Sequence, residues 1–448
     1  MNSVLSHESK EKSITMLAIA SFVFIFSLRD QSGSDIEIGR NHLIDGSGNN
    51  LLGAWASWFY SIFPSTFIPW GVYLSFLQVS LSALGVFLVI NAFKTTIPFR
   101  YRVLYYLLTY LIVDFASQQS RDGSMMAFLV FSFGLWRYAV SSKDLGNRVA
   151  IMLLSVCSLI IGFSFRPWLV FSLLPIFCFI LRSTKKTAKS GVLLIMIVAS
   201  PLVVENITFK ALDMENWFPQ QTVMIHDLSA TYCWNSSVNT REIAWKGLNH
   251  LSTSNTSKRE ICQAFKPNTW QAVVAAGTST DSGLPPLRTL EADSNLEYEK
   301  LKNQWIAVLI SDPFGYIQNH LMFSTQVLIA GEMREISLIS LTKEDFYSNL
   351  RSIWKLPSEL AKSLHLTSPV IAILFYAYSR RNLFDKTKLY GESNLFAAIL
   401  IVWVGITSIG YVSDNGRYTL VPVLMLYLSI LTSVSRLYSL KTGAHHGA

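Results

Sequence analysis

The sequence has little charge for its length. Only 15% of its 448 residues are Asp, Glu, Lys or Arg, whereas 51% are hydrophobic. Soluble domains carry about a quarter charged residues. The composition therefore excludes an ordinary soluble globular protein and indicates a chain with many membrane-spanning helices.

Further absences exclude whole classes of function. The four cysteines form no CxxC motif and no His/Cys cluster with the spacing of a zinc site. The net charge of +8 is not gathered into a basic region with interleaved aromatic residues, so nucleic-acid binding is not expected. The chain also has no internal repeat, which counts against a transporter built from repeated helical units.

Apolar stretches that can form membrane helices occur along the whole chain. Several are shorter than the roughly 20 residues that a spanning helix needs, so their flanks must add turns. No small-x-small cleavage site follows the first stretch, so we expect a retained span with a cytoplasmic start. The predicted spans are 14–28, 69–92, 103–117, 123–140, 149–163, 167–181, 191–206, 366–379, 395–411 and 418–435.

Lys and Arg gather in every second link between these spans. Arg137, Lys143 and Arg148, for example, follow the fourth span, and the links after the second, sixth, eighth and last spans are also basic. Basic links stay on the cytoplasmic side of a membrane. We therefore expect an all-α polytopic membrane protein of about ten transmembrane helices, with both termini in the cytoplasm.

One outer link is much longer than the others and predicts a small extracytoplasmic domain. It holds Cys233 and Cys262, and an extracytoplasmic location favours a disulfide between them over two free thiols. Cys157 and Cys178 lie in apolar spans and are expected to pack there. The predicted divisions are an N-terminal transmembrane module (1–206), an extracytoplasmic segment with amphipathic helices (207–365) and C-terminal transmembrane helices (366–448). Within the second, residues 315–331 form either a surface helix or a further span.

Three outer links carry ionisable residues near the ends of spans. A charge inside a membrane is costly unless it is paired or hydrated, so these residues indicate a polar cavity or a membrane surface. A carboxylate there can take a proton from an acceptor hydroxyl, and an arginine can hold a phosphate leaving group. This pattern favours group transfer from a lipid phosphate. The residues are Asp30, Asp35, Glu37, Arg40, His42 and Asp45, then Asp114, Arg121 and Asp122, then Asp414, Arg417 and Tyr418.

Several of these residues also have simpler explanations. Asp30 directly follows Arg29 at a span end and could be a solvated flank. Asp122 precedes an apolar run and could cap the next helix. Arg417 with Tyr418 could be an anchor at the membrane surface.

Two other features receive structural explanations. The Trp, Phe and Tyr residues between 55 and 70, around Pro64 and Pro69, indicate an interfacial or re-entrant helix pair with aromatic anchors. His226 is expected to be an ordinary surface histidine rather than a metal ligand.

The order of these motifs resembles the GT-C superfamily of membrane glycosyltransferases, which take a sugar from a polyprenyl-phosphate carrier. The resemblance rests on the acidic first outer link (Asp30 to Asp45), the second link SRDG with Asp122, and the late stretch GRYTLVPV. The stretches HDLSATYC, with His226 and Asp227, and WIAVLISDPFGYIQNHL also resemble segments of bacterial members.

The resemblance implies a role for several residues. A carboxylate of the first outer link, Asp30 or Asp35, would be the catalytic base, and Asp122 would orient the acceptor or a metal. Arg417 would contact the donor phosphate, with Arg40 or Arg166 as helpers. The residues expected to bind substrate are Glu37, Arg40, Arg121, Arg417 and Tyr418.

The resemblance also implies partners and a location. The donor would be a polyprenyl-phosphate sugar, the acceptor a glycan or lipid-linked saccharide, and the site the periplasmic face of a bacterial inner membrane. Serotype-converting glucosyltransferases of O-antigen have a similar size and layout. Some members use a divalent metal and others do not, so no cofactor is assigned.

Two other classes of function stay open. An O-antigen polymerase or ligase would rely on arginines of the long outer link, such as Arg241 and Arg259, rather than on carboxylates. A polysaccharide transporter or flippase would carry out no covalent chemistry.

Overall fold

Every regular element that the computed structural model describes is a helix, so the all-α class is confirmed for this part of the chain. The described residues are 13–21, 23–24, 40, 43–44, 53–63, 70–92, 106–113, 116, 120–142, 144–167, 169–170, 187–214, 221–235, 237–251, 261–262, 265, 292, 294–330, 370–374, 377 and 424–431.

Three of the helices are long and apolar enough to cross a membrane. They are α4 (Trp70–Ala92), α6 (Arg121–Ser141) and α7 (Leu145–Ser164). They coincide with the spans predicted at 69–92, 123–140 and 149–163 and support a membrane protein. The total number of spans and their orientation stay predictions.

The chain divides into two compact units. Unit 1 comprises Met1–Met214, Ser337–Trp403 and Leu420–Ala448, and unit 2 comprises Glu215–Ile336 and Val404–Thr419. Helix α9 (Thr187–Ala211) belongs to unit 1 and continues past the domain boundary that was placed at residue 206.

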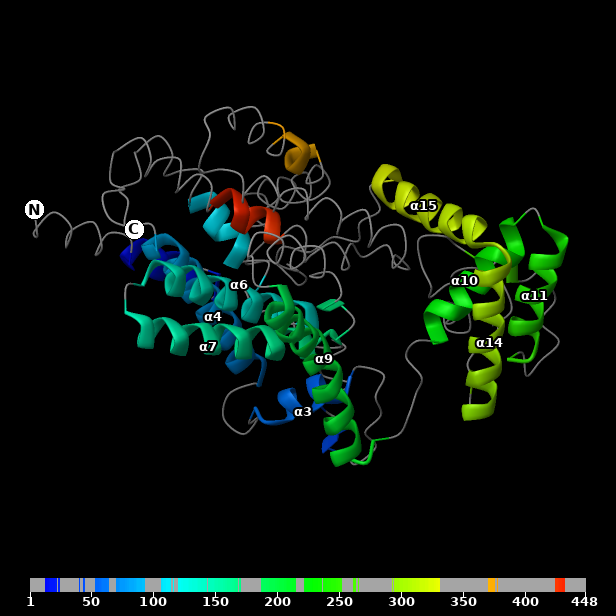
Figure 1. Ribbon diagram of the computed structural model, residues 1–448, viewed down its shortest axis with the longest axis horizontal. Coiled ribbons are helices and arrows are strands. Elements are labelled where there is room, and N and C mark those ends of the chain that lie inside the picture. Colours follow the sequence, from blue (N-terminus) through cyan, green and yellow to red (C-terminus); the bar gives the residue numbers. More distant parts are fainter. Residues whose placement is uncertain are drawn as a thin grey trace, which may run out of the picture. The chain divides into compact units, whose positions relative to one another are not determined.

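In unit 1, α6 packs against both α4 and α7 (Figure 1). Two glycines bring the backbones of α4 and α6 together. A Cβ atom on Gly85 would lie 2.5 Å from the Val130 carbonyl oxygen, and one on Gly134 would collide with the backbone of Gly85. Small residues allow such close approach between membrane helices, where packing replaces the hydrophobic effect as the driving force.

Buried hydroxyl groups join α6 to α7. The Ser132 hydroxyl donates to the Ser155 carbonyl oxygen and the Ser155 hydroxyl donates to the Ser132 carbonyl oxygen, each at 2.8 Å. The Ser158 hydroxyl donates to the Phe128 carbonyl oxygen at 2.9 Å. Polar groups at membrane depth must find partners inside the protein, and these serines do so across the helix contact.

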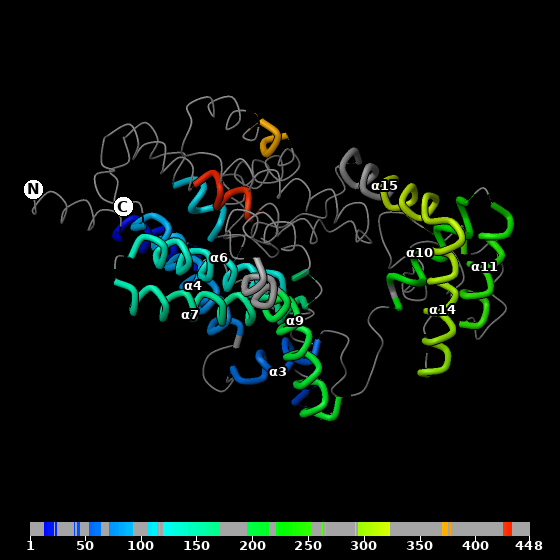
Figure 2. The backbone as a smooth tube through the Cα atoms, viewed as in Figure 1, coloured from blue at the N-terminus to red at the C-terminus, as the bar shows by residue number. Residues whose placement is uncertain are grey.

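Unit 2 contains four described helices longer than one turn (Figures 1 and 2). They are α10 (Gln221–Trp234), α11 (Val238–Asn249), α14 (Asn295–Ser311) and α15 (Pro313–Ala330). The first three supply residues to an apolar core and pack on one another, and α15 contacts α10 and α14. The buried core residues include Ile225, Leu228, Leu248, Leu301 and Val308.

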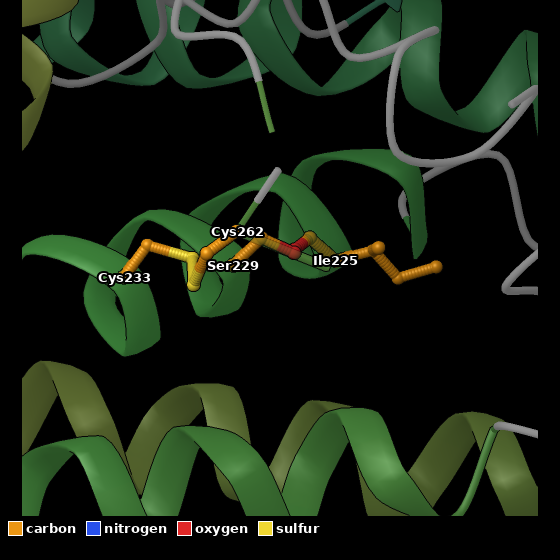
Figure 3. The surroundings of a disulfide bond; sticks show 4 residues. All are labelled: Ile225, Ser229, Cys233 and Cys262. Atoms are coloured by element: carbon orange, nitrogen blue, oxygen red, sulfur yellow. A yellow bond between two sulfur atoms is a disulfide. The ribbon is translucent and has the colours of Figure 1, made fainter. Parts of the chain in front are cut away.

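A disulfide between Cys233 and Cys262 ties the end of α10 to a segment 29 residues further along the chain. This is the pairing that the sequence favours. Ile225, Ser229 and Cys233 follow one another at four-residue spacing along α10 (Figure 3), and the Ser229 hydroxyl donates to the Ile225 carbonyl oxygen at 2.7 Å. Cys157, which was expected to pack, is instead exposed on α7, because the outward side of that helix is apolar.

Asp312 separates α14 from α15. Its carboxylate accepts hydrogen bonds from the Gly315 backbone N–H at 2.8 Å and from the Asn235 side-chain amide at 2.6 Å. Asp is a favoured N-cap, and Pro313 fits the first helical position because its missing N–H would be unpaired there. A Cβ atom on Gly315 would collide with the Asp312 side chain. The sequence DPFG therefore sets the turn between the two helices.

Candidate functional site at the start of helix α6

Asp122 and Arg166 form an ion pair through two parallel hydrogen bonds. The guanidinium Nε donates to Oδ1 at 2.9 Å and Nη2 donates to Oδ2 at 3.0 Å. The Asp122 side chain is 5% exposed and the Arg166 side chain 23%. Asp122 lies in the first turn of α6 and Arg166 follows the end of α7. The pair thus places opposite charges at the ends of two helices that can cross a membrane.

The local sequence explains how α6 begins. The Ser120 hydroxyl oxygen accepts a hydrogen bond from the Gly123 backbone N–H at 3.0 Å, so Ser120 caps the helix. The alternative that Asp122 is the cap is therefore wrong. A carboxylate in the first turn, such as Asp122, is still favoured by the helix dipole.

Three neutral side chains from different helices extend the site. The Tyr60 hydroxyl lies 2.9 Å from the Ser124 hydroxyl, and the Gln78 amide donates to the same Ser124 oxygen at 2.9 Å. All three residues are buried. Burial raises the pKa of the Tyr60 hydroxyl far above its usual range, while the Ser124 hydrogen bond and the Arg121 charge act in the opposite direction. Tyr60 is therefore a neutral hydrogen-bonding group near the ion pair.

Glu205 of α9 holds the start of α3 (Ala54–Ser61), the helix that carries Tyr60. Its carboxylate accepts from the backbone N–H of Ala54 at 2.6 Å and of Trp55 at 3.0 Å. Gly53, just before α3, has a φ of 91°, in the left-handed region that favours glycine. A carboxylate at a helix N-terminus is stabilised by the unpaired N–H groups and the helix dipole. Helix α9 therefore fixes the helix that brings Tyr60 to the site.

Arg121 adds a second cation to the site. It lies close enough to both Tyr60 and Glu205 for its charge to act on them. The Arg166 charge acts on the pKa of Tyr60 in the same direction as the Arg121 charge, and the Asp122 charge acts in the opposite direction. The site therefore combines two arginines, two carboxylates and a group of neutral hydrogen-bonding side chains.

The structure describes four of the predicted site residues. Asp122, Arg121 and Arg166 share the site, whereas Arg40 is buried and donates from Nη2 to the Phe63 carbonyl oxygen at 3.2 Å. Arg40 therefore supports the backbone after α3. The predicted residues that lie outside the described part of the chain are Asp30, Asp35, Glu37, Arg417 and Tyr418, so their convergence with Asp122 stays a prediction.

The aromatic residues of α3 were expected to be membrane anchors of an interfacial or re-entrant helix pair, and two of them have partners within unit 1. The Phe59 ring centroid lies 5.0 Å from that of Phe165 and 6.2 Å from that of Phe128. Tyr60 is buried against Ser124. These rings pack inside unit 1 because α3 contacts α9 and carries the Tyr60 hydroxyl to a buried partner.

A second buried carboxylate lies in unit 2. Asp227 Oδ2 accepts hydrogen bonds from the Trp305 indole at 2.9 Å and the Tyr316 hydroxyl at 3.0 Å, and Oδ1 lies 3.1 Å from His320 Nε2. The side chains of Asp227 and His320 are each 1% exposed. Burial, together with the Asp227 charge, raises the pKa of the Tyr316 hydroxyl far above its usual range. The Asp227 cluster is sealed from solvent and joins α10, α14 and α15.

Sequence reasoning identified both segments of the Asp227 cluster but not their contact. HDLSATYC supplies Asp227, and WIAVLISDPFGYIQNHL supplies Trp305, Tyr316 and His320. The available signal was the four-residue spacing of Tyr316 and His320, which puts both on one helix face. His226 was expected at the surface and is instead fully buried, with its ring centroid 5.1 Å from that of Phe265.

Within the described residues, no group of three or more His, Cys, Asp and Glu side chains could hold a metal ion. The two carboxylates of the site are already engaged, Asp122 by Arg166 and Glu205 by backbone N–H groups.

No protein-family model, no curated protein and no solved structure matches the chain. The site is therefore interpreted from its own chemistry.

Proposed function

We propose that the protein is a membrane glycosyltransferase that moves a sugar from a polyprenyl-phosphate donor to a cell-surface glycan or lipid-linked acceptor. The observation that carries this proposal is the Asp122–Arg166 ion pair at the ends of helices long enough to cross a membrane. Ionisable groups within such helices are costly and usually mark functional sites. A site at this position suits a substrate with one end in lipid and the other in water.

The pair offers the two kinds of group that sugar transfer needs. Arg166 is partly exposed, and its planar guanidinium can bind a donor phosphate as it binds the Asp122 carboxylate. Asp122 is then released to the acceptor hydroxyl, which it orients or deprotonates alongside the predicted base, Asp30 or Asp35.

The reaction is a single displacement at the sugar carbon. The acceptor oxygen forms the new bond to C1 as the bond from C1 to the phosphate oxygen breaks, and the acceptor proton passes to a carboxylate. Arg166 and Arg121 neutralise the charge on the polyprenyl phosphate that leaves. Attack from the face opposite the leaving group inverts the configuration at C1.

The sequence supports the cellular setting of the proposal. The alternation of basic links favours outer placement of the site, with both termini in the cytoplasm. The motif order that resembles GT-C enzymes favours the periplasmic face of a bacterial inner membrane and, more narrowly, an O-antigen glucosyltransferase.

The experiment measures the release of free polyprenyl phosphate. Purified full-length protein in vesicles receives a panel of radiolabelled polyprenyl-phosphate hexoses with a lipid-linked O-antigen saccharide as acceptor. We expect Asp122→Asn to lower the release by about 10²- to 10⁴-fold, because the amide cannot accept the proton. The matched control is Asp144→Asn, which changes an exposed carboxylate at the start of α7 and should leave the release unchanged.

The alternatives give different results. Full release in Asp122→Asn, Asp30→Asn and Asp35→Asn would remove the carboxylate mechanism and favour a polymerase or ligase that works through arginines. Movement of the intact donor across the bilayer, without free polyprenyl phosphate, would identify a transporter or flippase.

A further inference from the structure

Helix α15 of unit 2 has its polar and apolar faces reversed. A surface helix of a water-soluble domain turns its apolar side chains to the core and its polar ones to solvent. Side-chain burial in α15 is described for residues 313–322, and the buried residues there are Tyr316, Asn319 and His320. The exposed large apolar residues are Phe314 at 83%, Ile317 at 41% and Leu321 at 47%, and Gln318 is the one exposed polar side chain among them. The three apolar residues share one face, because they are three and four positions apart.

The end of α14 contributes to the same kind of surface. Ile306 and Ile310, one turn apart, are exposed, and Ile310 reaches 76%. Leu301 and Val308 of the same helix are buried in the core. We call the five exposed side chains the apolar stripe: Ile306, Ile310, Phe314, Ile317 and Leu321.

The charges of the two helices are separated from the apolar stripe along the chain. All four charged residues of α14 precede Ile306, and α15 contains no Asp, Glu, Lys or Arg. One end of the helix pair is therefore suited to water, and the other is suited to hydrocarbon. The charged residues of α14 are Glu297, Glu299, Lys300 and Lys302.

Helix α7 provides an internal standard for a lipid-facing helix in this chain. It is one of the three helices that can cross a membrane, and it buries Ser155 and Ser158 against its neighbour. After its first turn, in which Asn147 is exposed, its large exposed side chains are apolar: Val149, Leu153 and Leu154. The same reversal, with polar groups inward and apolar groups outward, occurs in α15.

We propose that the apolar stripe of unit 2 is a membrane-binding surface that packs on the hydrocarbon edge of the bilayer, while the charged first half of α14 stays in water. Reversed polarity is what a bilayer selects, because lipid solvates apolar side chains and leaves polar ones to find partners within the protein. Tyr316 and His320 have such a partner in Asp227. This inference does not depend on the proposed sugar transfer.

The experiment locates single side chains relative to lipid and water. Full-length protein, with Cys157 and Cys178 replaced by alanine and the disulfide intact, is labelled with a nitroxide at Phe314→Cys or Ile317→Cys. It is then placed in vesicles of phosphatidylethanolamine and phosphatidylglycerol. The collision rate of the nitroxide is measured with oxygen, which concentrates in lipid, and with a nickel chelate, which stays in water.

Two control labels calibrate the measurement. Leu153→Cys lies on the exposed apolar side of α7, and Glu242→Cys lies on the exposed surface of α11 in unit 2. We expect the ratio of oxygen to nickel collisions at Phe314 and Ile317 to exceed the Glu242 ratio several-fold and to approach the Leu153 ratio.

Either of two other results would overturn the proposal. Frequent collisions with nickel at Phe314 would place the apolar stripe in water. Infrequent collisions with both reagents would mean that protein covers it, either other parts of this chain or a second copy. The labelled positions are exposed, so the substitutions leave the core intact, and retention of the Cys233–Cys262 disulfide on a non-reducing gel verifies the fold of unit 2.

Discussion

The two units of the molecule accommodate buried polar groups in different ways. In unit 1, serine hydroxyls bond to backbone carbonyl groups across α6 and α7, and glycines let α4 and α6 approach closely. In unit 2, an apolar core and a disulfide hold the helices, and the buried polarity gathers around Asp227. The first pattern suits helices in lipid, where apolar burial gives little driving force. The second suits a domain that folds by removing apolar surface from water.

The buried carboxylates of the two units differ in whether another anion can reach the side chains that bind them. Asp122 is paired with Arg166, whose guanidinium is partly exposed and can accept another anion. Asp227 accepts hydrogen bonds from Trp305 of α14 and Tyr316 of α15, and the neighbouring His320 is as buried as the carboxylate itself. A buried aspartate is therefore a candidate for chemistry only where its partner remains accessible, and this distinguishes the site of unit 1 from the Asp227 cluster.

The largest effect is expected from Asp227→Ala. This change removes the acceptor of the Trp305 indole and the Tyr316 hydroxyl and the carboxylate beside the buried His320, and we expect unit 2 to lose about 3 to 5 kcal/mol of unfolding free energy. Urea unfolding of the full-length protein in detergent, followed by tryptophan fluorescence, measures it. Tyr316→Phe, which removes one donor, should cost about 1 to 2 kcal/mol. Equal stability of Asp227→Ala and the unchanged protein would contradict a stabilising role for the cluster.

The disulfide should come next. Replacing Cys233 and Cys262 by serine frees the loop between them and should lower the stability of unit 2 by about 3 kcal/mol, with α4, α6 and α7 unaffected. The protease resistance of unit 1 and of unit 2 is measured separately in the full chain, before and after the disulfide is reduced. Cys157→Ser on α7 is the matched control and should change neither unit. Equal loss of protection in both units would show that the disulfide does not act on unit 2 alone.

Gly134→Ala tests the close helix contact of unit 1. The added methyl group collides with the backbone of Gly85, so we expect a cost of about 1 to 3 kcal/mol in unit 1 and none in unit 2. Thermal unfolding in lipid nanodiscs measures it. Gly146→Ala adds the same methyl group where only Asp144 lies within 4 Å, at 3.7 Å, and should be tolerated. A tolerated Gly134→Ala would mean that α4 and α6 can separate without cost.

The smallest effect is expected from the helix caps. Ser120→Ala removes the cap of α6 and Ser237→Ala removes the cap of α11, and each should cost about 1 kcal/mol. Only Ser120→Ala should also lower the release of polyprenyl phosphate, because its helix carries Asp122 to Arg166. For each variant, the unfolding free energy and the release of polyprenyl phosphate are both measured. Equal loss of transfer in both variants would contradict the assignment of the site to unit 1.

Much of the helical structure could be predicted from sequence, since α4, α6 and α7 are continuous apolar runs between basic or polar links. The position of Asp122 at the start of a helix was predictable for the same reason. The pairing of Asp122 with Arg166 was not, because the two residues are 44 positions apart and local sequence does not select which arginine meets which carboxylate. The binding of α3 by Glu205 spans 151 positions and depends equally on tertiary packing.

Two expectations of burial were wrong, for different reasons. Cys157 was expected to pack and is exposed, because α7 can cross a membrane and its exposed surface need not be polar. His226 was expected at the surface and is buried, because its ring packs against Phe265 within unit 2. Residue polarity alone therefore does not distinguish inside from outside.

Glu205 joins α9 and α3 mechanically. Separating them would strip two backbone N–H groups and a carboxylate of their partners at once, so a shift of α9 carries α3 with it. Since α3 ends in the Tyr60–Ser124 contact, such a shift becomes a displacement of the tyrosine beside the first turn of α6. The hydrogen bonds of Glu205 and Tyr60 thus form a continuous connection from α9 through α3 to Ser124 of α6.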